Sequence, residues 1–245
     1  MNSLSSSIKF SDLSIDRGTH QIIKSISADL TEPRIGIIGR NGSGKSSLIR
    51  SFNGLLPIAS GSLQIHGVDA KTQSPELSRT AGFVFQNPDH QLIFPTPQEE
   101  ISFGLRQLGV DKKLAKQQAI AYLRDNGWQR LAESPVHELS EGQKQYLCIL
   151  AVLVMEPKLL ILDEPFSSLD FRTCEQLRRR LHQLPQQIVF VSHVFKVLED
   201  YDRILWLEEG TIKMDGPPQQ VLDSYLAHEQ ESLFDVSLLE DTSSR

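Results

Sequence analysis

The sequence has little cysteine, no long apolar run and no excess of positive charge, and each shortage excludes a class of protein. Its two cysteines, Cys148 and Cys174, form neither a metal-binding spacing nor a disulfide framework, which favours a reducing cytoplasm. No apolar run approaches the ~18 residues that a membrane-spanning helix needs. The net charge of −6 gives no overall basic field for nucleic acid. Contact with a membrane would therefore pass through a partner protein.

The start of the chain also lacks the features of a targeting segment, and the composition is otherwise ordinary. Residues 1–7 contain neither the basic stretch nor the apolar stretch of a secretory signal peptide. Apolar residues make up 39% of the chain and charged residues 23%, as in soluble globular proteins. We therefore expect a folded protein of one large domain or two modest ones.

Apolar periodicity predicts alternating strands and helices. The expected strands are 8–10, 13–15, 22–30, 34–38, 61–65, 82–85, 159–162, 188–191, 204–207 and 211–213. The expected helices are 46–53, 99–108, 112–126, 142–153 and 172–184. Asp16-Arg17-Gly18 predicts a turn, and Glu209-Gly210 predicts a hairpin. This order indicates one α/β core with a helical insertion at about 98–145.

The last part of the chain differs in composition from the rest. Residues 229–245 are polar and acidic, with a few apolar side chains such as Leu233, Phe234 and Leu238. Two interpretations stay open, a disordered tail and a docking segment for a partner. We expect the folded domain to occupy residues 1–228.

A glycine-rich segment matches a phosphate-binding pattern. Gly39-Arg40-Asn41-Gly42-Ser43-Gly44-Lys45-Ser46 fits G-x-x-x-x-G-K-S, with a predicted strand before it and a predicted helix after it. Glycines let the backbone curl so that N–H groups face phosphate oxygens, and the helix N-terminus favours negative charge. Lys45 reaches the β and γ phosphates, and the Ser46 hydroxyl ligates Mg²⁺. This context disfavours a chance match, and it predicts that nucleotide contacts Gly39, Asn41, Gly42, Ser43, Gly44, Lys45, Ser46 and Ser47.

Two carboxylates end a predicted buried strand. Residues 159–162 are all Leu or Ile, as in parallel strands covered on both faces, and Asp163 and Glu164 follow directly. A solvated acidic turn is the simpler interpretation, but the phosphate-binding loop in the same chain disfavours it. We expect Asp163 to hold Mg²⁺ through water and Glu164 to polarise the attacking water.

A third motif, Leu139-Ser140-Glu141-Gly142-Gln143, opens a predicted helix before that strand. With it, the chain resembles the nucleotide-binding subunits of ABC transporters over about residues 8–225. The resemblance implies a P-loop α/β NTPase domain with an N-terminal antiparallel β subdomain and a helical subdomain. It also implies that Ser140, Gly142 and Gln143 complete an ATP site held by another subunit. Two subunits, with a homodimer favoured, would sandwich two ATP molecules.

Further positions match this family. Gln86 resembles the glutamine that touches Mg²⁺ and the water and links them to the transport partner. Ser167-Ser168-Leu169-Asp170 resembles the loop that crosses the dimer seam, where Asp170 serves the nucleotide site. His193 resembles the switch histidine that contacts the γ-phosphate. A lone histidine is usually structural, but the position of His193 after a predicted strand reverses that interpretation, which stands for the other six histidines.

The segment 85–105 resembles a narrower group, the ATPases of energy-coupling factor (ECF) importers. Its first part reads Phe85-Gln86-Asn87-Pro88-Asp89-His90-Gln91. Phe94-Pro95 and the short C-terminus suggest the biotin type within that group. The resemblance implies a groove near Phe94, Glu99 and Glu100 for a helix of a transmembrane coupling subunit, with the glutamates pairing with its arginines. The alternative is an ordinary amphipathic helix with an acidic first turn.

The sequence departs from the family pattern at three positions. Arg17 stands near the place where many members stack an aromatic ring on adenine, and its guanidinium plane could stack instead. Glu141 replaces the usual glycine of the third motif, and we expect its side chain to point away from phosphate. Tyr146 replaces the arginine common in the ECF group, so an electrostatic contact would be missing.

The resemblance implies an ATP-hydrolysing subunit of an ECF-type importer of a vitamin, with biotin suggested, or of a metal ion. It would use ATP and Mg²⁺ and lie at the cytoplasmic face of the membrane, attached through membrane subunits. The substrate-binding membrane subunit would be contacted only indirectly. Two alternatives stay open, a soluble ABC-type ATPase and a poorly catalytic regulatory module. Arg17 and Glu141 motivate the second alternative, whereas Glu164 and His193 disfavour it.

Overall fold

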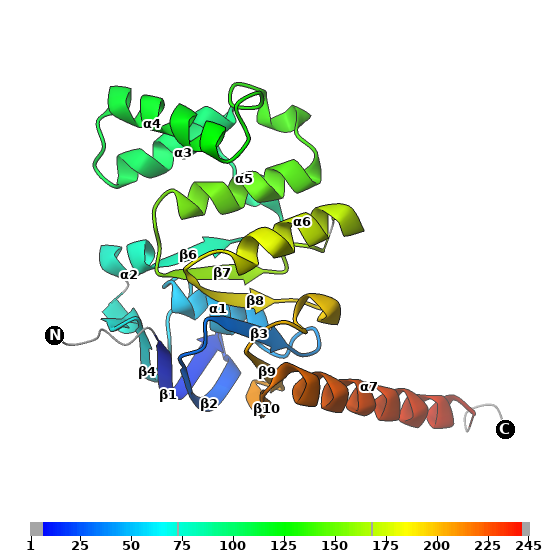
Figure 1. Cartoon of the computed structure of the whole chain (residues 1–245). Helices are drawn as coiled ribbons and strands as arrows, with labels where there is room; N and C mark the ends of the chain where they lie inside the picture. Colours follow the sequence, from blue (N-terminus) through cyan, green and yellow to red (C-terminus); the bar gives the residue numbers. More distant parts are fainter. Residues whose placement is uncertain (1–6, 73, 168, 242–245) are drawn as a thin grey trace.

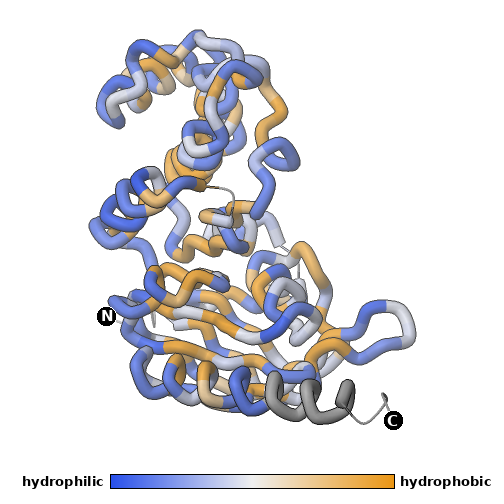
Figure 2. Tube along the Cα trace, turned by 90° about the vertical axis from the view of Figure 1, so that its right-hand side faces the viewer, coloured by the Kyte–Doolittle hydropathy of each residue, from blue (hydrophilic) through white to orange (hydrophobic). Residues whose placement is uncertain are grey.

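The computed structural model describes residues 7–72, 74–167 and 169–241, and two β-sheets organise it (Figure 1). One sheet has four strands in the order β2-β1-β4-β5, and the other has six in the order β10-β9-β3-β8-β7-β6. Helix α1 (Lys45–Phe52) packs between them, and the apolar stretches gather where the sheets lie (Figure 2). The α/β class predicted from the sequence is confirmed.

The four-stranded sheet is antiparallel and contains the first part of the chain. Its strands are β1 (Ile8–Arg17), β2 (His20–Leu30), β4 (Ser60–Ile65) and β5 (Val68–Asp69). The expectation of two short strands at 8–10 and 13–15 is wrong, because β1 runs through both. Asp12 takes a left-handed backbone with φ 48°, and the pairing register with β2 shifts between Phe10 and Leu13. A bulge thus absorbs the break in the apolar pattern, and the turn follows Arg17.

The six-stranded sheet carries the segments in which the sequence predicts phosphate-binding and acidic motifs. Its strands are β3 (Arg34–Ile38), β6 (Ala81–Val84), β7 (Leu159–Asp163), β8 (Gln187–Val191), β9 (Arg203–Glu208) and β10 (Thr211–Gly216). β6, β7, β8, β3 and β9 are parallel, and β10 returns antiparallel to β9 through the expected hairpin. Every residue of β7 and β8 is buried, because helices cover one face of the sheet and α1 and the other sheet cover the opposite face.

A helical subdomain stands at the top of Figure 1. It contains α3 (Pro97–Gln107), α4 (Lys112–Asp125) and the start of α5 (Glu141–Leu153), all within or overlapping the segment 98–145. These helices bury a core of their own, which includes Ile101, Ala119, Leu123, Leu147 and Leu150. Because α5 also packs on the six-stranded sheet through Cys148 and Ile149, it joins this subdomain to the rest of the protein.

Two further helices belong to the second half of the chain. α6 (Phe171–His182) covers the six-stranded sheet, and α7 (Pro218–Asp241) extends away from it (Figure 1). The domain boundary expected at residue 228 falls inside α7. Residues 229–241 belong to this helix, and residues 242–245 lie outside the described part. Among the described residues no helix, α7 included, is both long and apolar enough to cross a membrane.

Candidate nucleotide-binding site

Strand order brings the predicted motifs to one edge of the six-stranded sheet. The parallel strands β6, β7, β8 and β3 are consecutive neighbours, so their carboxyl ends meet at the same edge. The P-loop (residues 39–46) follows β3, and Gln86 follows β6. Asp163 and Glu164 end β7, and His193 follows β8. Side chains from four separate parts of the chain thus come together.

The curled backbone of the P-loop requires glycine at three positions. Gly39, Gly42 and Gly44 have φ values of 144°, 83° and 104°, which other residues rarely adopt. A Cβ on Gly39 would lie 2.1 Å from the carbonyl oxygen of Leu207, so no side chain fits there. Gly44 is the N-cap of α1 and directs the loop into the helix N-terminus.

Lys45 lies inside the curl of the P-loop. Its Nζ donates to the carbonyl oxygens of Gly39 (2.6 Å) and Arg40 (2.9 Å). Burial lowers the pKa of the Lys45 ammonium, and the negative charges of Glu164 and Asp163 act in the opposite direction. An ammonium that bonds to two carbonyls, with two carboxylates near enough to affect its pKa, is placed to meet a phosphate by exchanging the carbonyl contacts.

The other P-loop residues differ in exposure. Asn41 and Gly42 are exposed, and Ser47 is half-buried. Ser43 is buried, and its Oγ has no hydrogen-bond partner within the part of the chain that the structure describes. A buried polar atom without a partner at this position fits a loop built for an anion.

Ser46 and Asp163 form an oxygen pair at the end of the P-loop. The Ser46 Oγ donates to Asp163 Oδ1 at 3.1 Å, and the Arg50 guanidinium lies 3.7 Å from Oδ2. Burial raises the pKa of the Asp163 carboxyl, while the Ser46 hydrogen bond and the Arg50 charge lower it. A hydroxyl and a carboxylate are hard oxygen ligands of the kind that Mg²⁺ prefers, so these residues fit that ion.

Glu164 and His193 are in direct contact. His193 Nε2 lies 2.9 Å from Glu164 Oε1. Glu164 takes a left-handed backbone with φ 49°, and its N–H donates to the Val191 carbonyl at the end of β8. This strained turn points the carboxylate to the edge of the sheet rather than into the core.

Gln86 contacts the loop that follows β7. Its Nε2 donates to Ser167 Oγ at 3.4 Å. Ser168 lies outside the described residues. Asp170 is the N-cap of α6, and its carboxylate accepts from the N–H groups of Arg172 (2.9 Å) and Thr173 (3.1 Å). The Thr173 hydroxyl bond and these amide bonds lower the pKa of the Asp170 carboxyl.

The third motif forms a compact turn at the start of α5, and we call residues 139–143 the signature turn. Ser140 Oγ accepts from the Gln143 N–H (3.3 Å), and the Gln143 side-chain oxygen accepts from the Ser140 N–H (2.8 Å). This capping box satisfies both residues within the turn. The turn therefore closes on itself, with the α5 N-terminus open to an anion from outside.

The family model described as ABC transporter matches residues 23–167. The chain belongs to the ABC transporter family. It is the ATP-binding part of such a transporter, an ABC ATPase whose ATP hydrolysis is coupled to transport, as predicted from the sequence.

Individual relatives cover nearly the whole ABC ATPase. It is 42% identical to the biotin transport ATP-binding protein BioM of Rhodobacter capsulatus, over 90% of this chain and 94% of the relative. It is 31% identical to BioM of Rhizobium etli, over 89% of this chain and 97% of the relative. Among solved structures, cbiO1 of Clostridium perfringens, part of the transporter complex cbiONQ, superposes with a TM-score of 0.78 at 28% identity. That match covers 92% of this chain and 94% of cbiO1.

The unusual Glu141 of this ABC ATPase faces a lysine. Its Oε1 lies 3.5 Å from Lys144 Nζ, which also forms an ion pair with Asp89 at 2.9 Å. Glu141 is the first residue of α5, where a negative charge is favoured by the helix dipole. The side chain thus has a local partner one turn further along the same helix.

We expect Glu141→Gly to leave ATP turnover within about twofold of the parent, because exposed ion pairs contribute little. The helix loses a dipole-favoured charge, so a slightly lower melting temperature is expected. Steady-state ATPase assays and thermal unfolding would measure both. A large gain in turnover would instead mean that this carboxylate repels a γ-phosphate.

A positive charge from another helix lies over Tyr146 of this ABC ATPase. The Arg180 guanidinium of α6 lies 4.3 Å from the Tyr146 ring centroid, and Trp128 packs on the same ring at 5.8 Å. The contact expected to be missing at position 146 is therefore replaced by a cation–π contact.

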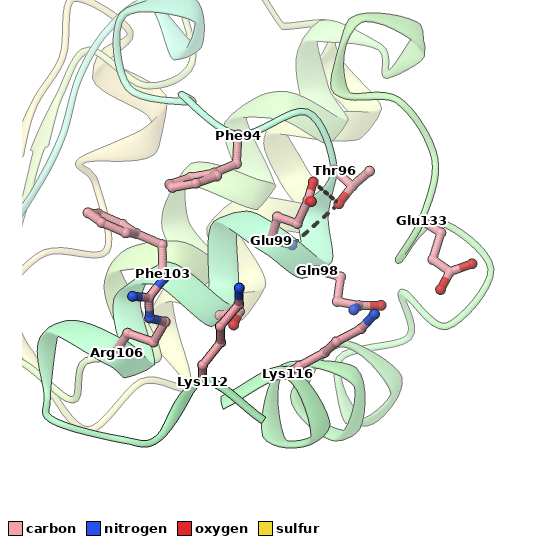
Figure 3. A pocket seen from close by; sticks show the side chains of 10 residues that line it. Phe94, Thr96, Gln98, Glu99, Phe103, Arg106, Lys112, Lys116 and Glu133 are labelled. Carbon is pink, nitrogen blue, oxygen red and sulfur yellow. Dashed lines mark hydrogen bonds between the residues drawn. The ribbon is translucent and has the colours of Figure 1, made fainter. Parts of the chain in front are cut away.

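A groove of about 530 Å³ lies on the helical subdomain (Figure 3). Phe94 and Phe103 line it as a packed aromatic pair with ring centroids 5.0 Å apart. Glu99 is exposed and accepts from the Thr96 hydroxyl at 2.8 Å. The remaining lining is mainly charged and comprises Arg106, Lys112, Lys116 and Glu133, with Gln98 and Ser102. The groove thus combines an aromatic wall with charges of both signs.

Glu100 differs from its neighbour. It is only 6% exposed, and its Oε2 accepts from the backbone N–H groups of Ile93 (3.0 Å) and Phe94 (2.9 Å). Burial raises the pKa of this carboxyl, and the two backbone bonds lower it. The expectation that Glu100 pairs with a partner arginine is wrong, because its carboxylate holds the loop that carries Phe94. Glu99 alone faces outward.

Gln91 has a role that the sequence did not reveal. Its side-chain oxygen accepts from the Phe85 N–H (3.1 Å), and its Nε2 donates to the Cys148 carbonyl (3.3 Å). Gln145 of α5 also donates to the Phe85 carbonyl at 3.1 Å. The segment after β6 is thereby fastened to α5. The available signal in the sequence was its place at the end of the segment Phe85 to Gln91, which resembles the ECF group.

Proposed function

We propose that this chain is the ATP-hydrolysing subunit of an ECF-type importer and that two copies of it form the working dimer. One observation carries the proposal: the continuous segment 86–94 links Gln86 at the nucleotide site to Phe94 at the groove. Biotin is the favoured cargo, since two relatives are biotin transport proteins, and a metal ion is the alternative. The protein would bind the cytoplasmic face of the membrane through membrane subunits.

The site residues divide the work of phosphoryl transfer. P-loop N–H groups and Lys45 bind the phosphates, and Ser46 and Asp163 would hold Mg²⁺, with Gln86 beside it. The ion would supply positive charge that neutralises the charge developing on the phosphate. Glu164 accepts the proton of the attacking water. His193, 2.9 Å from Glu164, orients that carboxylate and contacts the γ-phosphate.

A second subunit completes each site. Ser140 and Gln143 bond to each other within their own turn, with Gly142 between them in the sequence. The α5 N-terminus faces outward as an anion site for the partner's nucleotide. Asp170 caps α6, whose first turn lies next to the start of α5. Closure of the dimer on two ATP molecules would move the coupling helices, and hydrolysis would release them.

The groove receives a helix of the transmembrane coupling subunit. An apolar side chain of that helix would pack on the Phe94–Phe103 pair, and a basic one would pair with Glu99. The substrate-binding membrane subunit is reached only through this partner, and no nucleic acid is involved. The Glu164–His193 contact favours this catalytic function over a regulatory module, because a chain without hydrolysis has no need of the pair.

Co-purification tests the importer. The tagged chain, expressed in its host and extracted in mild detergent, is expected to retain a coupling subunit that mass spectrometry identifies. The double variant Phe94→Asp, Glu99→Lys should lose it, whereas Glu76→Lys, an exposed position on α2 (Pro75–Thr80), should not. Retention of no membrane protein by the parent would overturn the importer. Retention by the double variant would overturn the groove as the docking site.

For Arg17 we expect a smaller effect, on binding of the adenine ring. Its side chain is exposed at the end of β1, and we propose that its guanidinium plane stacks on adenine without reading base edges. Arg17→Ala should weaken ATP and GTP binding alike, by about 2- to 10-fold. Titration with fluorescent nucleotides would measure this. Tight preference for ATP together with unchanged binding in the variant would contradict the stacking.

A further inference from the structure

The helices α5 and α6 begin side by side, and one side chain joins their N-termini. α5 begins with the signature turn in the helical subdomain, whereas α6 begins at Asp170 after the core strand β7. Thr173, in the first turn of α6, touches both. It lines a cavity of about 220 Å³ together with Ser140, Gly142 and Gln143. These two beginnings belong to different structural units, so their register depends on the contacts between them.

Each end of the Thr173 side chain serves one of the two segments. Its Oγ1 donates to Asp170 Oδ2 at 2.6 Å. Its methyl group lies against Gly142, where an added Cβ would be only 2.5 Å from the Thr173 Cγ2. The hydroxyl therefore fixes the carboxylate of the Asp170 loop, and the methyl group fixes the distance to the signature turn.

We propose that Thr173 is a positioning residue that holds the signature turn and the Asp170 loop as one unit, so that both reach the partner's nucleotide together. The inference rests on the dimer of the proposed function. Further along α5 and α6, Arg180 joins the two helices again, with its guanidinium carbon 4.3 Å from the Tyr146 ring centroid. Thr173 is thus the contact closest to the groups that the partner's phosphate would meet.

Two conservative variants separate the two contacts. Thr173→Val keeps the methyl group and replaces the hydroxyl by a second methyl group, whereas Thr173→Ser keeps the hydroxyl and removes the methyl group. In a Glu164→Gln background, we expect each to raise the ATP concentration for half-maximal dimer formation by about 3- to 10-fold. Binding of a fluorescent ATP analogue to the monomer should not change, because the P-loop of the same chain is untouched.

As a control, Thr72→Val removes a comparable exposed hydroxyl bond, to the Asp69 carbonyl at 2.9 Å, away from the contact between α5 and α6. It should leave the ATP concentration for half-maximal dimer formation unchanged. Wild-type ATP dependence in both Thr173 variants would overturn the inference while leaving the dimer intact. If the Thr173 variants also weakened nucleotide binding to the monomer and lowered its melting temperature, Thr173 would have only a structural role. A Glu164→Gln parent that never dimerises with ATP would overturn the dimer and the inference with it.

Discussion

Glu164→Gln is expected to bind ATP and lose nearly all turnover. The amide has the size of the carboxylate and can keep the contact to His193 that the carboxylate makes at 2.9 Å. It has no basic oxygen to accept the proton of the attacking water, and a positioned base contributes about 10²–10⁴-fold to such a step. A loss of that size with little change in ATP affinity would assign Glu164 to the chemical step rather than to binding.

The same variant should accumulate as an ATP-bound dimer on gel filtration, because the closed state no longer resets. Glu156→Gln is the matched control. Glu156 is exposed in the turn after α5 and has φ 53°, close to the 49° of Glu164, so the substitution meets the same backbone conformation away from the site. The control should keep parent turnover and stay monomeric. Turnover near the parent rate in Glu164→Gln would remove it as the catalytic base.

The placement of Gln86, Glu164 and His193 could be predicted from the sequence, because each follows a strand that the apolar pattern identifies. Residues 159–162 are entirely apolar, which indicates a parallel strand inside the sheet. Parallel strands deliver their carboxyl ends to one edge, so Gln86, Glu164 and His193 had to meet near the P-loop. That topology accounts for the contact between Glu164 and His193, and the structure gives its distance as 2.9 Å.

Other features depend on packing between distant segments, which local patterns do not encode. The pattern in β1 breaks at Asp12, and only the pairing with β2 shows that a bulge carries the strand through. Glu99 and Glu100 are identical in type and adjacent, yet one faces outward and the other is buried under the Phe94 loop. Thr173 has no motif to mark it, because its role arises where α5 and α6 meet.

Mixed dimers should show that the signature turn serves the nucleotide of the other subunit. Gly142→Ala places a Cβ 2.5 Å from the Thr173 methyl group, so the Thr173 side chain, the turn or α6 must shift, and Lys45→Ala removes the P-loop ammonium. Each change alone breaks both sites of a homodimer. With the changes on different chains, completion in trans leaves one site intact, formed by the wild-type P-loop of one chain and the wild-type turn of the other.

The reverse arrangement makes the prediction sharp. When one chain carries both changes and its partner neither, completion in trans leaves each site with one defect. We therefore expect turnover at least about 10-fold higher in the different-chain dimer, since losing one phosphate-stabilising group costs ~10²–10³-fold. Two affinity tags allow each mixed dimer to be isolated and assayed. Gly216→Ala, where an added Cβ meets nothing closer than 3.7 Å, replaces Gly142→Ala in the control pair and should leave the two arrangements equal. If the turn acted on its own P-loop, the order would reverse, because the same-chain dimer would then keep the intact site.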